Sequence, residues 1–228
     1  MDELAAIRQL DRVATIPQAA NTEYPGWRTM ISSLGVPGPD VRTISLPVEA
    51  TEPSAETLGA VRQRYCVPGV PLVLCVGSHE PRKNHLAVLH AAELLWRQGL
   101  EFSLVFVGGN AWHSGRFHRR VTELQAAERP VEAAFGVSDD TLWALYRLAR
   151  CTVFPSLNEG FGLPVAESLA SGTPVVTSDF GSMFEIGAEG GALLINPRDD
   201  RAIAAPIQPL LTHDRTHDRL GPHAPAPP

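Results

Sequence analysis

Short apolar runs, each bounded by glycine, proline or polar residues, recur along this chain of 228 residues. The run at 71–77 reads PLVLCVG and the run at 103–107 reads SLVFV, so neither alternates apolar with polar side chains. Continuous runs of this length are typical of parallel strands that are buried on both faces. Together with weaker runs, they predict strands at 12–16, 41–46, 71–77, 103–107, 131–135, 151–154, 175–177 and 192–195.

Stretches with helix-starting and helix-ending residues lie between these runs. Ser138 is a favourable N-cap, and Asp139 and Asp140 follow it in the first turn, where the helix dipole favours acids. Proline at a helix start and glycine just past a helix end are also typical signals, as at Pro164 and Gly172. These signals predict helices at 2–10, 23–34, 55–65, 85–98, 115–128, 139–149 and 163–171.

Strands that alternate with helices predict an α/β fold, a Rossmann-like doubly wound parallel sheet with helices on both faces. Most of the alternation lies in residues 48–200, which are predicted to form this domain. Residues 1–47 hold too few elements for a full sheet and are interpreted as the end of a larger unit. In residues 201–228, Pro206 and Pro209 are expected to disrupt a helix, so a degraded or disordered tail is predicted.

Composition and charge restrict the partners and the location of the protein. The net charge of -6 argues against nucleic-acid binding, and the three scattered cysteines lack metal-site spacing. Residues 1–4 are acidic and lack the features of a signal peptide, and no run is long enough to span a bilayer. The sequence therefore predicts a cytoplasmic protein with at most peripheral contact at the inner face of a membrane.

The candidate chemistry lies in loops that follow the predicted strands. In open parallel sheets, ligands bind beyond the carboxyl ends of the strands. The loops 77–83, 108–113, 136–138 and 156–163 each follow a predicted strand, so they should converge on one rim of the sheet.

Two glutamates stand in the last of these loops and in the helix after it. Glu159 lies in the loop that continues as Gly160-Phe161-Gly162, and Glu167 lies eight residues later, within the helix predicted to start at Leu163. Backbone N–H groups at a helix N-terminus suit an anion such as phosphate. A carboxylate can accept hydrogen bonds from two neighbouring hydroxyls, as on a ribose or hexose. Either glutamate alone is also compatible with a plain loop or helix-dipole role, but the pair favours a polyhydroxylated ligand.

Arg82 and Lys83 lie at the start of the helix that follows the run at 71–77. Two cations with free helix N–H groups would neutralise a diphosphate, although a solvent-facing basic pair is the structural alternative. Their predicted position on the same rim as Glu159 favours the binding interpretation. No GxGxxG follows a strand, which disfavours an NAD-dependent oxidoreductase, and the chain has no Walker A loop, no GxSxG elbow and no DxD pair.

Three segments resemble retaining glycosyltransferases of the GT-B fold, glycosyltransferase family 4 (group 1). VGSHEPRKN at 76–84 is similar to the EPRKN signature, and 137–146 is similar to the VSDxxLxxLY helix. FPSLNEGFGLPVAESLASGTPVV at 154–176 is similar to the E-x7-E region. The resemblance covers about residues 60–200. It implies that 1–47 are a remnant of the acceptor-side N-terminal domain, most of which is missing from this chain and would come from another chain.

The resemblance also implies roles for individual residues. Arg82 and Lys83 would stabilise the diphosphate leaving group, Glu159 would hold hydroxyls of the transferred sugar, and Glu167 would hold the ribose hydroxyls. Ser78 stands where many members have a second phosphate-binding arginine, so Arg82 would substitute for it. Further residues implied to bind the sugar nucleotide are Gly77, Ser78, Gly108, Val137, Phe161, Gly162 and Leu163.

These roles lead to the hypothesis of a retaining, mannosyltransferase-like enzyme. It would transfer a hexose from a GDP- or UDP-linked sugar to a polysaccharide or lipid-linked acceptor, without a metal or another cofactor. The alternative hypothesis is a truncated, catalytically inactive module that binds a sugar nucleotide.

Overall fold

The computed structural model describes residues 12–16, 29, 33, 35, 39–44, 46–214 and 220. The strands are β1 (Arg12–Thr15), β2 (Asp40–Thr43), β3 (Leu72–Val76), β4 (Ser103–Val107), β5 (Val131–Ala134), β6 (Cys151–Phe154), β7 (Val175–Ser178) and β8 (Ala192–Ile195). The helices are α3 (Ala55–Tyr65), the 3₁₀ helix η1 (Pro81–Lys83), α4 (His85–Arg97), α5 (Gly115–Ala126), α6 (Asp139–Leu148), α7 (Leu163–Ala170), α8 (Gly181–Gly187) and α9 (Asp200–Thr212).

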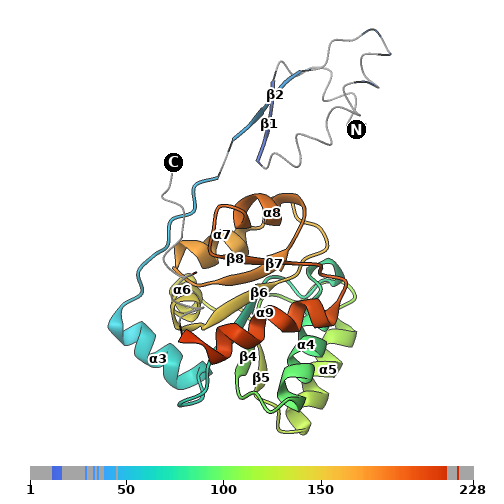
Figure 1. Cartoon of the computed structure of the whole chain (residues 1–228). Helices are drawn as coiled ribbons and strands as arrows, with labels where there is room; N and C mark the ends of the chain where they lie inside the picture. The colour runs from blue at the N-terminus through green and yellow to red at the C-terminus, as the bar shows by residue number, and fades with distance from the viewer. Residues whose placement is uncertain are drawn as a thin grey trace.

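Six of the strands form one parallel sheet in the order β5-β4-β3-β6-β7-β8 (Figure 1). The chain enters at the central strand β3, winds outward to β5, returns to the centre at β6 and winds the other way to β8. The direction of winding reverses between β3 and β6, where Val73 pairs with Cys151. Such a reversal opens a crevice at the carboxyl ends of the two strands, and ligands bind there in sheets of this type. The fold-class prediction is confirmed.

Helices cover both faces of this sheet because each central strand presents apolar side chains to both sides. Val73 and Cys75 belong to the core that α4, α5 and α9 complete on one face. Leu72 and Leu74 face the other way, toward α3 and α6, and Phe154 packs with α7 and α8. This two-sided burial explains why the sequence shows continuous apolar runs instead of alternation.

β1 and β2 pair in parallel as a separate two-stranded sheet, with Val13 opposite Val41. Figure 1 shows this pair outside the larger sheet, linked to α3 by the stretch 46–54, which has no helix or strand. The strand predicted at 41–46 ends at Thr43. The helix predicted at 2–10 lies outside the described residues, as does most of the helix predicted at 23–34, and the domain boundaries stay predictions.

The prediction that Pro206 and Pro209 disrupt the next helix is wrong. Asp200–Thr212 form α9, which runs beside α4 (Figure 1). Each proline costs a helix interior about 3 kcal/mol. Fully burying one aliphatic side chain contributes about 1.5–3 kcal/mol in return, and the buried face of α9 consists of Ile203, Ala204, Ile207 and Leu210. The tail predicted beyond it falls mostly outside the described residues.

The sequence pattern also misses α8 altogether. Phe180, the residue before this helix, gives no side-chain cap, and the first turn of α8 carries no acid. The helix is held instead by tertiary packing, with Met183 buried beside α7 and β7. Of the helices in the described ranges, none combines the length and apolar character that a bilayer crossing requires.

Candidate functional site

The loops after β3 and β6 meet at the crevice between these two strands. The backbone carbonyl of Arg82, in η1, accepts hydrogen bonds from the Leu157 N–H at 2.7 Å and from the Ser156 hydroxyl at 3.0 Å. The two loops are thereby joined although more than seventy residues separate them in the chain. The predicted convergence of 77–83 and 156–163 on one rim is confirmed.

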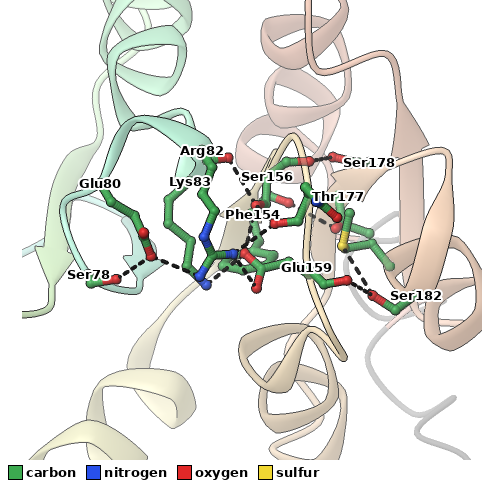
Figure 2. Close-up of polar contacts among 12 residues, drawn as sticks. Ser78, Glu80, Arg82, Lys83, Phe154, Ser156, Glu159, Thr177, Ser178 and Ser182 are labelled. Carbon is green, nitrogen blue, oxygen red and sulfur yellow. Dashed lines mark hydrogen bonds and ion pairs between the residues drawn. The ribbon is translucent and has the colours of Figure 1, made fainter. Parts of the chain in front are cut away.

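Glu159 is the centre of a polar cluster at this junction (Figure 2). Its carboxylate lies 2.6 Å from the Lys83 ammonium and 2.9 Å from the Arg82 guanidinium, and it accepts a hydrogen bond from Ser156 at 2.7 Å. The Glu159 side chain is only 7% exposed. Charged hydrogen bonds in such a sheltered position are stronger than those at a solvated surface.

A second carboxylate, Glu80, binds the other side of Arg82. The Arg82 guanidinium lies 2.8 Å from Glu80, which also accepts a hydrogen bond from the Ser78 hydroxyl at 2.8 Å. Partial burial opposes ionisation of Glu80, but Ser78 and Arg82 together hold the pKa of this carboxyl below its ordinary value. Burial likewise disfavours the charged guanidinium, yet hydrogen bonds and charge from Glu159 and Glu80 raise the pKa of Arg82. The cluster therefore pairs two cations with two carboxylates.

Lys83 is almost fully buried between Glu159 and the Phe154 ring. Its side chain is 9% exposed, and its ammonium lies 4.9 Å from the centre of the Phe154 ring. Lys83 is the only lysine in the chain, whereas the other eighteen basic residues are arginines. A lysine has a flexible stem and a compact charge, whereas an arginine has a larger planar guanidinium, so the two are not interchangeable at this buried position.

Glycine is required at two positions near Lys83. Gly77 has φ 142°, a backbone conformation that residues with a side chain rarely adopt. A Cβ on Gly108 would lie 2.0 Å from the Gly77 carbonyl oxygen, closer than any two such atoms approach. The loops after β3 and β4 are therefore in direct backbone contact.

The N-terminus of α7 opens onto the same rim. Gly162 precedes the helix with φ 96°, a conformation that favours glycine, and no side chain caps this end. Phe161 is partly buried and Leu163 is 46% exposed. Uncapped N–H groups at this position agree with the predicted anion site, although the anion itself stays a prediction.

Glu167 lies farther along α7 and contacts none of the cluster around Glu159. One of its oxygens, Oε2, accepts a hydrogen bond from the Tyr146 hydroxyl of α6 at 2.7 Å. Burial raises the pKa of Glu167, the Tyr146 hydrogen bond opposes this change, and the charge of Asp139 adds to it. The two glutamates are thus held by different partners.

The structure brings together Arg82, Lys83 and Glu159, with Gly77 and Ser78 beside them. Val137 follows β5 and packs against the core on the α6 side of the sheet. The sequence alone indicates no role for Ser156, Glu80 or Tyr146. All three belong to the quoted motifs, so the motifs contained a signal, but nothing in the sequence pairs Ser156 with Glu159, Glu80 with Arg82 or Tyr146 with Glu167.

Comparison with known proteins adds to this geometry. The family model described as Glycosyl transferases group 1 matches residues 65–226. O-antigen chain mannosyltransferase B of Escherichia coli is 35% identical over 155 residues, which cover 68% of this chain and 40% of that protein. A serotype-specific mannosyltransferase WbdA, also of Escherichia coli, is 31% identical over 232 residues, covering 98% of this chain and 27% of that protein. The chain spans less than half the length of these two relatives.

A solved structure shows the same architecture. The sucrose-phosphate synthase of Thermosynechococcus elongatus superposes with a TM-score of 0.77 at 26% identity, covering 97% of this chain and 54% of that chain. The parallel six-stranded sheet matches the GT-B glycosyltransferase structures. The family match covers most of the chain and includes the crevice with Lys83 and Glu159, so the protein belongs to the group 1 family of glycosyl transferases.

Proposed function

We propose that this chain binds the sugar nucleotide of a retaining hexosyltransferase that acts on a polysaccharide or lipid-linked acceptor. A GDP- or UDP-linked hexose is the substrate, with mannose preferred. The observation that carries the proposal is the sheltered cluster of Lys83, Arg82 and Glu159 at the crevice between β3 and β6. The names of the two Escherichia coli relatives support mannose, and one of these names supports an O-antigen acceptor.

The cluster would neutralise a diphosphate by exchanging partners. Arg82 and Lys83 are now paired with Glu80 and Glu159, and their summed charge is zero. A diphosphate in the crevice would take hydrogen bonds from both cations, which would stabilise the charge that develops on the leaving group. The two cations and the helix N–H groups would perform this role without a metal or another cofactor.

Glu159 would then be free to bind the transferred sugar. An ionised carboxylate has about four lone-pair positions, and Lys83, Arg82 and Ser156 occupy most of them. Once the cations turn toward the phosphates, Glu159 could accept hydrogen bonds from hydroxyls of the hexose. The uncapped start of α7 at Gly162 and Leu163 would contact a phosphate, and Glu167 would hold the ribose.

Binding to the wild-type chain and to one variant tests this proposal. Calorimetry with GDP-mannose and UDP-glucose should show saturable binding, and Lys83→Met should weaken it about 10- to 100-fold, because a hydrogen bond to a charged group contributes about 1.5–3 kcal/mol. The matched control is Arg97→Met, which removes a cation whose side chain is 71% exposed. This control should leave affinity unchanged.

A transfer assay then addresses the reaction. The wild-type chain should transfer the hexose to a polysaccharide or lipid-linked acceptor, and NMR of the product should show the anomeric configuration of the sugar nucleotide. Absence of binding at millimolar sugar nucleotide would refute the proposed site. The alternative, an inactive binding module, is not favoured, because the named relatives are transferases; binding without transfer would support it.

A further inference from the structure

A tyrosine from a neighbouring helix holds the glutamate that is proposed to bind ribose. Tyr146 of α6 is completely buried, whereas Glu167 of α7 is partly buried. The hydroxyl of Tyr146 donates to Oε2 of Glu167 at 2.7 Å. The other oxygen, Oε1, is not enclosed and has no hydrogen-bonding partner among the described residues.

We propose that Tyr146 is a positioning residue for nucleotide binding. By fixing Oε2 of Glu167, its hydroxyl holds Oε1 in place to accept a hydrogen bond from a ribose hydroxyl. The inference rests on the proposed function and deepens it, because it makes the Tyr146–Glu167 pair the element that selects ribonucleotides over nucleotides without ribose hydroxyls.

The position of the Tyr146 hydroxyl is set by a rigid seam between α6 and α7. The backbone carbonyl of Tyr146 accepts a hydrogen bond from the buried Thr173 hydroxyl at 2.7 Å. Next to it, the Arg147 guanidinium donates to the Ser171 carbonyl at 3.0 Å. The Thr173 hydroxyl and the Ser171 carbonyl both lie just after α7, so these two hydrogen bonds tie α6 to the end of the helix that carries Glu167. A phenol anchored in this way has little freedom to follow a moving carboxylate.

The direction of the Tyr146–Glu167 hydrogen bond is also fixed. Burial, reinforced by the charge of Glu167, raises the pKa of Tyr146 well above its ordinary value, so the phenol remains a donor. Burial raises the pKa of Glu167, but the hydrogen bond from Tyr146 favours the ionised form. An ionised carboxylate only accepts hydrogen bonds. Its free oxygen Oε1 therefore suits a hydroxyl donor.

Two hydroxyl deletions test this role: one removes the hydroxyl of Tyr146 from the protein, and the other removes the ribose hydroxyls from the nucleotide. Tyr146→Phe keeps the ring and removes the bond to Glu167. Its affinity for GDP and UDP should fall about tenfold, the factor that corresponds to roughly 1.4 kcal/mol. Its affinity for 2′,3′-dideoxy-GDP should stay within about twofold of the wild-type value, because that ligand has no hydroxyl for Glu167 to bind. The control is Tyr65→Phe, since the Tyr65 hydroxyl forms no hydrogen bond with the described residues.

A double-mutant cycle completes the experiment. If Tyr146 acts through Glu167, then Tyr146→Phe should add nothing in a Glu167→Ala background. Thr173→Val, which releases the backbone of Tyr146 and leaves the phenol intact, should give a smaller loss of the same ribose-dependent kind. It provides the test if Tyr146→Phe does not fold.

Two results would overturn the inference while leaving the proposed function standing. One is wild-type affinity in Tyr146→Phe. The other is an equal loss for GDP and dideoxy-GDP, which indicates a purely structural role. If the wild-type chain binds neither GDP nor UDP, the proposed function is overturned, and this inference with it.

Discussion

Gly108 sets how closely the loops after β3 and β4 approach one another. Its Cα stands against the Gly77 carbonyl, and Gly77 in turn lies next to the Lys83 side chain. Any side chain at position 108 would collide with the backbone of Gly77 and Ser78, so the loop after β3 would have to shift. The geometry around Lys83 therefore depends on a residue that carries no functional group.

Substitution of Gly108 tests this dependence. Gly108→Ala places a methyl group 2.0 Å from a carbonyl oxygen, so the backbone must shift. Overpacking of this kind costs about 1–3 kcal/mol, and a chemical denaturation curve should show that loss. Gly109→Ala is the matched control, because a Cβ there meets nothing within 4 Å. Equal stabilities for the two variants would contradict the prediction.

The residues that bind one another across the site were only partly predictable from sequence. The proximity of Lys83 and Glu159 follows from their loops, because both loops leave carboxyl ends of parallel strands. The hydrogen bond between Tyr146 and Glu167 does not follow, because it depends on how two helices pack side by side. Sequence patterns specify which face of a helix is apolar but not which polar groups meet at the seam.

At the scale of elements, α9 shows that burial can outweigh local propensity. The strand β4 lies where the apolar run 103–107 predicts it, because the run and the glycines that follow it indicate the same strand. In α9 the signals conflict: Pro206 and Pro209 argue against a helix, while an apolar stripe argues for one. The stripe prevails because α4 offers a surface to cover it. That surface is not visible in the local sequence.

Truncation of one buried side chain tests the importance of α9. Ile207 is 2% exposed, and Ile207→Ala should lower the free energy of unfolding by about 2–4 kcal/mol. The adjacent Gln208 is exposed, so Gln208→Ala serves as the control and should change stability by less than about 0.5 kcal/mol. Thermal or denaturant melts of the two variants provide the comparison. Similar melts would mean that α9 does not belong to the cooperative fold.

At the scale of the whole molecule, two buried histidines connect the stability of the fold to pH. His79 and His85 are 2% and 3% exposed, and their ring nitrogens have no hydrogen-bonding partner among the described residues. Burial, together with the charge of His118, lowers the pKa of His79 to about 4. Burial, with smaller effects from neighbouring charges, lowers the pKa of His85 to about 3. At neutral pH the folded chain therefore keeps both imidazole rings uncharged.

Acidification should consequently destabilise the protein. An unfolded histidine takes up a proton near pH 6.5, whereas folded His79 does so only near pH 4. Stability should therefore fall as pH drops below 6.5, by roughly 2 kcal/mol for each histidine between pH 7 and 5. In the double variant His79→Phe/His85→Phe, the free energy of unfolding, measured by denaturation at each pH, should lose most of this dependence on pH. The control His90→Phe changes a half-exposed position and should retain the pH dependence. If the double variant keeps the pH dependence of the wild-type chain, the two buried histidines are not its cause.

The single lysine of the chain has a practical consequence for the study of the site. Reductive methylation with ¹³C-formaldehyde would label one side chain, Lys83, and otherwise only the terminal amine. The resulting NMR signal would come from the group that lies between Glu159 and the Phe154 ring. Its chemical shift would report whether the crevice is occupied, without any engineered probe. Because all remaining Lys and Arg positions hold arginine, the methylated Lys83 would serve as a spectroscopic marker of the candidate site.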